Sequence, residues 1–250
     1  MKLLFDLGNT RCKWATAAGG HLGRSGAFTR GDDIAQRFRT LITRLEPPEA
    51  VYGISVAAPE IWAALVHLCR EHWGIEAHEL VTPSEGGGVK VAYTHPRGLG
   101  TDRWAAMVGA AARHMLPACV IDCGTALTVD VVGGSGHHRG GLILPGLSTM
   151  RRSLSTGTHA LPSVNDGPVP LLANNTSDAI RAGTLRGLAA TVDGLYDQLS
   201  RELGEPLSPV ITGGDAGTLL EYLRTPFHIA PDLILEGIAH YVEGAHCGSS

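Results

Sequence analysis

The chain has 250 residues, of which 44% are hydrophobic and 18% charged, with a mean hydropathy of +0.07 and a formal net charge of -4. A chain of this length can form one large domain or two small ones whose cores need no disulfide or metal. The chain is slightly acidic and has no long run of Lys and Arg, so it lacks the clustered positive charge with which nucleic-acid-binding proteins neutralise phosphates. We therefore expect a globular protein that does not bind nucleic acid.

The N-terminal segment MKLLFDLGNT reaches an Asp at position 6 and a Gly soon after. Its apolar stretch is too short for a signal peptide or a membrane span. The 5 cysteines are scattered and form no CxxC pair, which argues against a disulfide framework and a structural zinc site. We expect a cytoplasmic protein with reduced thiols that binds no membrane.

Strands and helices alternate in the first part of the chain. Residues 2–7 form an apolar run with one Asp, which predicts a buried strand, a Gly-Asn-Thr turn and a returning strand. A helix is predicted over residues 32–45, with its apolar side chains on one face and Asp32 or Asp33 as N-cap. The next predicted elements are a strand over residues 51–57, a helix over 59–73 and a short strand over 77–82.

Residues 83–101 are rich in Gly and Pro and lead into a helix predicted over residues 102–115. Such a long loop is a natural place for a substrate site. Residues 118–134 then repeat the opening pattern of apolar strand, Asp-x-Gly turn and second strand. The remaining predictions are an apolar segment with Gly and Pro over residues 139–149, a long helix over 177–203, a strand, turn and helix over 208–223 and a last helix over 234–243.

The two Asp-x-Gly turns are the most informative feature. LLFDLGNTRCKWA around Asp6 and CVIDCGTALTVDV around Asp122 share their strand context, which indicates an internal duplication. Each turn offers backbone N–H groups to phosphate oxygens, a hydroxyl, and a carboxylate that can hold a cation. Asp and Gly are also common in ordinary hairpin turns, so one copy alone would say little. Two copies in matched contexts favour phosphate binding.

Four ordered segments resemble the signature segments of type III pantothenate kinases, members of the actin/hexokinase/Hsp70-like fold. They are DLGNTRCK at 6–13, GTDR at 100–103, DCGT at 122–125 and GGLILPG at 140–146. The resemblance spans nearly the whole chain. It implies ATP-dependent phosphorylation of pantothenate to 4'-phosphopantothenate, the first step of coenzyme A biosynthesis.

The duplication and the resemblance together predict an α/β protein with a duplicated actin-like (ribonuclease H-like) two-lobe ATPase fold. Residues 1–117 would form an N-terminal lobe with a phosphate loop and the substrate loop. Residues 118–250 would form a C-terminal lobe with the second phosphate loop and a turn on the adenine side. The nucleotide is expected between the lobes.

The resemblance assigns ATP binding to the first loop and to one residue of the second turn. The implied residues are Asp6, Leu7, Gly8, Asn9, Thr10, Arg11, Cys12, Lys13 and Thr125. Asp122 is implied as the ligand of a monovalent cation, K⁺ or NH₄⁺, and Mg²⁺ would arrive with ATP. The charges agree, because a carboxylate beside a triphosphate repels it unless a cation lies between them.

Phosphoryl transfer also needs a group that accepts the proton of the attacking alcohol. The resemblance gives that role to Asp102, for which the alternative is a helix N-cap. Arg103 can donate two hydrogen bonds to a carboxylate, which pantothenate has and a sugar lacks, or it can be a solvated Arg on the helix surface. The residues implied to bind pantothenate are Tyr93, Gly100, Thr101, Asp102, Arg103 and Thr176.

The resemblance further implies a homodimer whose substrate pocket takes Thr176 from the neighbouring subunit. Tyr93 and Thr176 have ordinary alternatives, which are core packing and helix capping. NNTSD directly before a predicted helix is a good capping sequence.

Motifs that are absent or incomplete narrow the classes of protein to which the chain can belong. The chain has no GxxxxGK[ST], which excludes the P-loop families, and no GxGxxG after its first strand, which disfavours a dinucleotide-binding fold. His114, His137 and His138 lack further ligands at metal spacing, so a solvated loop is expected. Cys123 has no His fixed nearby by the sequence and is expected to pack as a small hydrophobe.

Two other functions stay open on the residues alone. A kinase or phosphatase of the same fold can act on a sugar, acetate or polyphosphate, because the fold and the phosphate loops do not name the acceptor. A non-catalytic relative can bind a ligand or a regulator. The presence of Asp6, Asp102 and Asp122 favours the active enzyme.

Overall fold

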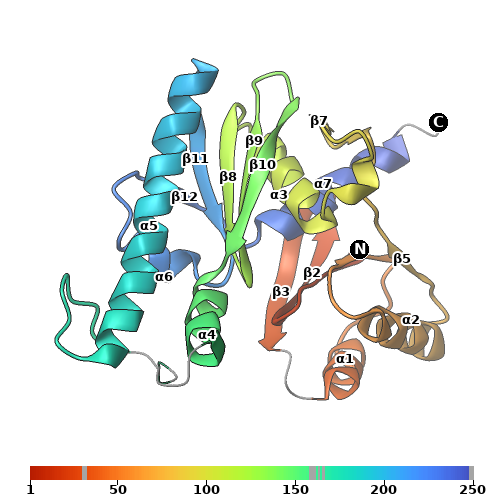
Figure 1. Ribbon diagram of the computed structural model, residues 1–250. Helices are drawn as coiled ribbons and strands as arrows, with labels where there is room; N and C mark the ends of the chain where they lie inside the picture. The colour runs from red at the N-terminus through yellow and green to blue at the C-terminus, as the bar shows by residue number, and fades with distance from the viewer. Residues whose placement is uncertain (30–32, 158–161, 163, 165–166, 248–250) are drawn as a thin grey trace. The chain divides into compact units, whose positions relative to one another are not determined.

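The structure is a computed structural model that describes residues 1–29, 33–157, 162, 164 and 167–247, with side chains described as far as residue 244. The chain divides into two compact units (Figure 1). Unit 1 comprises Met1–Met115, Gly136–His138 and Asp232–Ser250, and unit 2 comprises Leu116–Ser135 and Arg139–Pro231.

A five-stranded sheet forms the centre of the described part of unit 1, with the strand order β3-β2-β1-β4-β5. The strands are β1 (Lys2–Leu7), β2 (Arg11–Ala18), β3 (His21–Thr29), β4 (Ala50–Ser55) and β5 (Ala77–Glu79). β1 pairs antiparallel with β2 and parallel with β4. All residues of β1 are buried, because the strand has hydrogen-bonded neighbours on both edges and helices packed against it.

Helices pack against both faces of this sheet. They are α1 (Ile34–Ile42), α2 (Pro59–Trp73), α3 (Thr101–Ala112) and α7 (Leu233–Cys247). The loop before α3 contains a hairpin of β6 (Glu85–Gly86) and β7 (Val89–Lys90), followed by the short 3₁₀ helix η1 (Pro96–Gly98). The core between the sheet and α1 and α2 includes Phe5, Phe38 and Leu65. On the other face, α7 contacts β1 to β4, and the Lys2 ammonium forms an ion pair with Glu243.

Helices α3 and α7 lie side by side and touch through their backbones (Figure 1). A Cβ atom on Gly237 would lie 1.9 Å from the Ala105 carbonyl oxygen, and one on Gly109 would lie 2.2 Å from the Leu233 carbonyl oxygen. The close crossing therefore explains why glycine occupies these two positions. This crossing holds α3, whose first turn carries expected substrate residues.

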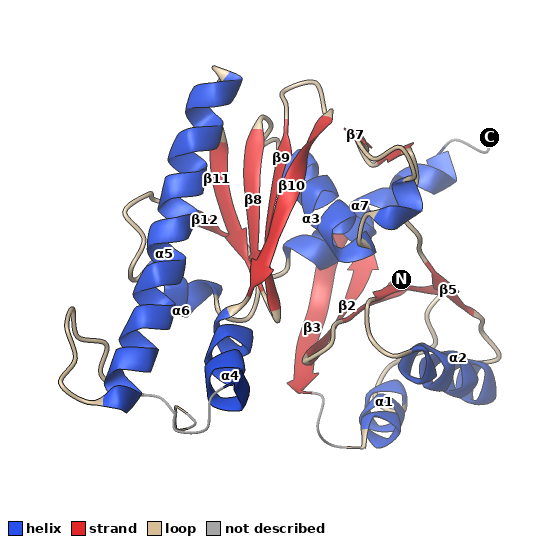
Figure 2. Cartoon of the chain, in the orientation of Figure 1, coloured by secondary structure: helices blue, strands red, loops and turns tan. Residues whose placement is uncertain are grey.

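Unit 2 repeats the arrangement of the first sheet, because its described strands follow the order β10-β9-β8-β11-β12 (Figure 2). The strands are β8 (Ala118–Cys123), β9 (Ala126–Val132), β10 (His138–Pro145), β11 (Ser208–Thr212) and β12 (His228–Ile229), and the helices are α4 (Leu147–Gly157), α5 (Thr176–Leu203) and α6 (Ala216–Leu220). Apolar side chains of β8, β9 and β11 form a core with α5 and α6.

The two sheets place their Asp-x-Gly aspartates at the same position of the strand, although the first turn is one residue longer than the second. Asp6 is the second-last residue of β1 and lies opposite Lys13, and Asp122 is the second-last residue of β8 and lies opposite Thr128. Each of these strands pairs antiparallel with the next strand and parallel with a later one. The duplicated two-lobe α/β fold predicted from the sequence is confirmed.

Several local predictions need correction. β3 was missed because most of its residues are exposed at the edge of the sheet, so the strand lacks an apolar run. Residues 139–149 are the strand β10 followed by the start of α4, and α4 continues to Gly157. Asp33 caps α1 by accepting the Gln36 N–H at 3.1 Å, and Asp32 lies outside the described residues.

The predicted lobes were residues 1–117 and 118–250. The chain does pass from unit 1 to unit 2 between Met115 and Leu116, but its last segment returns to unit 1. The physical reason is the crossing of α7 with α3 at Gly237.

We predict that Gly237→Ala lowers the free energy of unfolding by about 1–3 kcal/mol, because the added methyl group overpacks the helix crossing. Gly187→Ala is the control. Gly187 is an exposed residue of α5, and a Cβ there would have no atom within 4 Å apart from its chain neighbours and the backbone of its own helical turn. This change should therefore stabilise the helix by up to about 1 kcal/mol. Thermal unfolding of both variants checks the sign, and equal stabilisation by both would contradict the close crossing.

Candidate active site

The first turn, between β1 and β2, is tight and open to ligands. The Gly8 N–H donates to the Arg11 carbonyl at 3.1 Å, and a Cβ on Gly8 would lie 2.8 Å from that oxygen. Asn9, Thr10 and Arg11 are exposed at the tip, whereas the Asp6 side chain at its base is only 8% exposed. The turn therefore presents backbone and hydroxyl groups to solvent above a buried carboxylate.

Two of the residues expected to bind ATP have buried side chains. Leu7 and Cys12 are both 0% exposed and belong to the core beneath α1 and α2. Only their backbone groups can reach a ligand. Lys13 is half-buried and lies opposite Asp6 on the neighbouring strand, so its side chain shares the face of the sheet that carries Asp6.

The second turn, between β8 and β9, is held in place by the start of α4. The Gly124 N–H donates to the Ala126 carbonyl at 3.0 Å. The Thr125 carbonyl accepts hydrogen bonds from the Gly146 N–H at 3.0 Å and from the Thr149 hydroxyl at 2.7 Å. The peptide group of Thr125 is thus fixed by the chain that begins the next helix.

Gly146 allows this close approach. A Cβ at this position would lie 2.1 Å from the Gly124 carbonyl oxygen. Because Gly146 directly precedes α4, the free backbone N–H groups of the first helical turn lie beside the Asp-x-Gly turn. A helix N-terminus attracts anions, so this position suits a phosphate group.

The turn between β11 and α6 packs against Asp122. Gly213 has φ +98, and a Cβ there would lie 2.5 Å from the Asp122 Oδ1 atom and from the Cys123 backbone nitrogen. The Asp215 N–H donates to the Cys123 carbonyl at 3.0 Å. Glycines of the GGLILPG segment at 140–146 and of the β11–α6 turn therefore pack directly against the second turn. Asp215 is an additional carboxylate at this site, and its position after two glycines and before a predicted helix is the signal in the sequence that could have indicated it.

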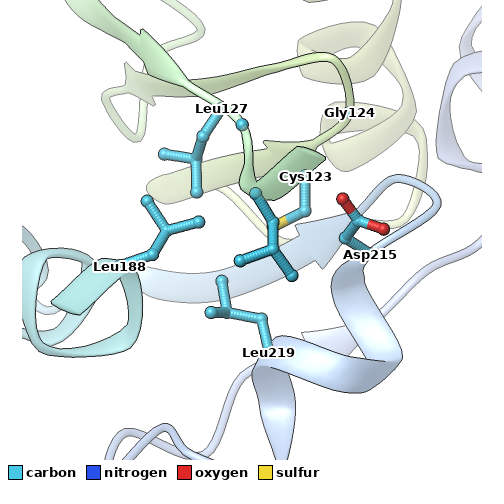
Figure 3. A pocket seen from close by; sticks show the side chains of 8 residues that line it. Cys123, Gly124, Leu127, Leu188, Asp215 and Leu219 are labelled. Carbon is cyan, nitrogen blue, oxygen red and sulfur yellow. The ribbon is translucent and has the colours of Figure 1, made fainter. Parts of the chain in front are cut away.

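Apolar side chains pack closely together beneath the second turn (Figure 3). Leu127, Leu188 and Leu219 gather around Cys123, and the Asp215 carboxylate points away from them. The space they enclose has no room for a water molecule. Burial, together with the nearby carboxylates of Asp122 and Asp215, raises the pKa of the Cys123 thiol. Cys123 is a packed hydrophobic residue, as the sequence predicted.

Asp102 lies in the first turn of α3 but does not cap it. Gly100 is the N-cap residue and Asp102 is the second residue of the helix, where its Oδ1 accepts the Arg103 N–H at 2.8 Å. A Cβ on Gly100 would lie 2.5 Å from the same oxygen. The N-cap alternative is therefore wrong, and the glycine leaves space for the Asp102 carboxylate. The Thr82 hydroxyl donates a hydrogen bond to the Thr101 hydroxyl at 3.4 Å.

The buried Arg103 side chain is paired with the half-buried Tyr93. The Arg103 side chain is 6% exposed, so the alternative of a solvated surface Arg is wrong. Its guanidinium donates to the Tyr93 hydroxyl at 3.1 Å, and its carbon lies 5.9 Å from the centre of the Tyr93 ring. Since the Tyr93 oxygen accepts from Arg103, the Tyr93 O–H can donate to another group. Guanidinium and phenol donors together suit a carboxylate ligand.

The three histidines differ in exposure. His114 and His137 are exposed, whereas His138 is 4% exposed and its ring stacks on Tyr93, with ring centres 5.9 Å apart and planes inclined by 15°. A solvated position is thus the wrong expectation for His138. No group of three or more His, Cys, Asp or Glu side chains within the described residues is placed to hold a metal ion.

Thr176 is exposed at the first residue of α5. Asn175 caps this helix by accepting the Asp178 N–H at 2.9 Å, so the capping alternative for Thr176 is wrong. Two apolar residues shortly before it in the chain, Leu171 and Leu172, are 77% and 90% exposed.

The structure groups the expected site residues within the units. Unit 1 contains the first loop and the substrate segment with Tyr93, Asp102 and Arg103, and unit 2 contains Asp122 and Thr125. None of the helices in the described part of the chain combines the length and apolar character that a membrane-spanning helix requires.

The fold of the chain is shared by two solved structures. It superimposes on component A of the Acidaminococcus fermentans (R)-2-hydroxyglutaryl-CoA dehydratase with a TM-score of 0.56 and 14% identity, covering 99% of this chain and 98% of the other. The activator of the Clostridium difficile 2-hydroxyisocaproyl-CoA dehydratase, solved with bound ADPNP, gives a TM-score of 0.53 and 13% identity over 99% and 94% of the two chains. At these identities the likeness shows the fold alone.

The sequence signature of the type III pantothenate kinase family matches residues 2–198. Type III pantothenate kinases from Nitrosococcus oceani and Alkalilimnicola ehrlichii are 37% and 38% identical to this chain. The alignments cover 96% and 95% of this chain and 92% and 96% of the respective relatives. The chain belongs to the type III pantothenate kinase family.

Proposed function

We propose that Asp102 is the general base for the reaction of this family, the ATP-dependent phosphorylation of pantothenate to 4'-phosphopantothenate that begins coenzyme A biosynthesis. The observation that carries this proposal is the arrangement at the start of α3. Asp102 lies beside a glycine that leaves its carboxylate space, and the next residue, Arg103, is buried against Tyr93. A carboxylate positioned next to a substrate hydroxyl can accept its proton during transfer.

Pantothenate recognition is proposed for Tyr93, Gly100, Thr101 and Arg103. Arg103 and Tyr93 provide the hydrogen-bond donors, and pantothenate provides the carboxylate and amide oxygens that accept them. This pair favours an acceptor molecule with a carboxylate over a neutral sugar, because a guanidinium forms its strongest, two-pronged hydrogen bonds with a carboxylate. The alternative of a non-catalytic relative is disfavoured by the presence of Asp102 together with both phosphate turns.

ATP binding is proposed for the loop Asp6–Lys13 in unit 1 and for Thr125 in unit 2. The first loop exposes its turn residues, and Thr125 lies beside the N-terminus of α4, where backbone N–H groups can meet phosphate oxygens. We further propose that the enzyme works in the cytoplasm.

Asp122 is proposed as the ligand of a monovalent cation, K⁺ or NH₄⁺. The half-buried carboxylate of Asp122 and the Thr125 hydroxyl are oxygen donors, the type that hard cations prefer. The bound cation would reduce the repulsion between this carboxylate and the triphosphate. Mg²⁺ is expected to enter with ATP.

A homodimer is proposed in which the substrate pocket of one protomer includes the partner subunit's Thr176. The exposed Thr176 and the exposed side chains of Leu171 and Leu172 support a subunit contact at this end of α5. Leu142 and Ile143, on the sheet-edge strand β10, are also exposed, at 43% and 64%.

Asp102→Asn is expected to lower kcat by about 10²–10⁴-fold, the range for loss of a general base. The change keeps the size of the side chain, so the melting temperature should stay nearly the same. The control is Glu60→Gln, which alters an exposed acid in the first turn of α2 and should leave kcat unchanged. Near wild-type turnover of Asp102→Asn would rule out this residue as the base.

Asp122→Asn is expected to remove most of the activation by K⁺ while changing the KM for pantothenate much less. Initial rates are measured with K⁺, NH₄⁺, Na⁺ and Tris as the only monovalent cations. Asp197→Asn, at an exposed carboxylate of α5, is the control and should keep the wild-type response. Equal rates of the wild-type enzyme in all four salts would disprove the proposed cation site.

Thr176→Ala is expected to raise the KM for pantothenate by roughly 2- to 12-fold, the equivalent of one hydrogen bond worth about 0.5–1.5 kcal/mol. Thr191→Ala on the same helix is the control, because the Thr191 hydroxyl donates within α5, to the Gly187 carbonyl at 2.8 Å. Sedimentation should show a dimer for both variants. A monomeric wild-type protein, or an unchanged KM, would count against the shared pocket.

A further inference from the structure

His138 belongs to β10 by sequence but packs in unit 1. The short segment Gly136–His138 is bound to the hairpin β6–β7, where the Lys90 N–H donates to the Gly136 carbonyl at 2.9 Å. Lys90 and His137 also form an isolated parallel bridge. A Cβ on Gly136 would lie 2.2 Å from the Gly88 carbonyl oxygen, so the two backbones are in direct contact. This docking carries the His138 side chain to the loop that precedes α3.

At that loop, the His138 ring covers one face of Tyr93. The two rings are nearly parallel, at 15°, with centres 5.9 Å apart. The Ala92 N–H points to the His138 Nδ1 atom at 3.5 Å, which is a long contact. His138 is 4% exposed, whereas Tyr93 is half-buried and stands outside any strand or helix.

Tyr93 is therefore restrained at two points. The Arg103 guanidinium fixes its hydroxyl at 3.1 Å, and His138 fixes the plane of its ring. A Tyr side chain in a loop can otherwise change between rotamers, and each change would take the hydroxyl away from Arg103. Arg103 would then lose one of the groups that hold its buried guanidinium in place.

We infer that His138 is a positioning residue for pantothenate binding, which acts by holding Tyr93 in the orientation that keeps its hydroxyl on Arg103. The inference rests on the proposed roles of Tyr93 and Arg103 as substrate ligands. His138 contributes through its flat ring, so another planar aromatic residue can replace it and an aliphatic residue of similar volume cannot.

The test compares His138→Phe, which keeps a flat ring, with His138→Leu, which fills the same space without one. The KM values for pantothenate and for ATP, kcat and the melting temperature are measured for both. Stacked aromatic pairs contribute about 0.5–1.5 kcal/mol, so His138→Leu should raise the KM for pantothenate roughly 2- to 12-fold and leave the KM for ATP unchanged. His138→Phe should keep both values near those of the wild-type enzyme.

A second arm repeats His138→Leu in a Tyr93→Ala background, where the change should add nothing to the KM for pantothenate because the partner ring is gone. Equal effects of Phe and Leu at position 138, a parallel rise in the KM for ATP, or additive effects in the double variant would each overturn the inference. If Tyr93→Ala alone leaves the KM for pantothenate unchanged, the proposed substrate role of Tyr93 fails, and the inference about His138 fails with it.

Discussion

In each half of this protein, a carboxylate lies near the end of a strand that is paired on both edges. β1 and β8 each occupy the middle of a sheet and have a paired strand on either edge. Their backbone groups are used in pairing and their apolar side chains are buried, so only the end of each strand and the turn that follows can meet a ligand. Asp6 and Asp122 lie at this end of the sheet, one residue before their strands finish. The duplication therefore repeats a position for chemistry as well as a fold.

In unit 2, the second turn keeps its shape because other segments touch its backbone. Gly146 brings the start of α4 against Gly124, and Gly213 brings the β11–α6 turn against Asp122. Each contact would be blocked by a single Cβ atom. The same two glycines can be interpreted from sequence as ligand-binding turns or as packing positions, and the structure shows both of them packed against the second turn. Packing at these glycines places the N-terminus of α4 beside the turn.

Structure could be predicted best from the sequence where the residues of a single strand or helix determine which of its side chains are buried. The helix predicted over residues 59–73 agrees with α2, and both Asp-x-Gly hairpins lie where their apolar strands indicated. It was least informative where burial comes from a distant segment. His138 and Arg103 belong to residue types that are usually exposed, and each is buried by contact with the loop around Tyr93. No local pattern carries that information.

The proposed acceptor site follows from the geometry of one helical turn. Asp102 and Arg103 are consecutive, and successive residues of a helix project about 100° apart, so the two side chains serve different parts of one ligand. Arg103 turns inward to Tyr93, while the positive end of α3 favours a carboxylate at position 102. A ligand that satisfies both needs an anionic or strongly accepting group for Arg103 and a hydroxyl for Asp102. Pantothenate carries both groups in one flexible molecule, whereas acetate lacks the hydroxyl and a neutral sugar lacks the charge.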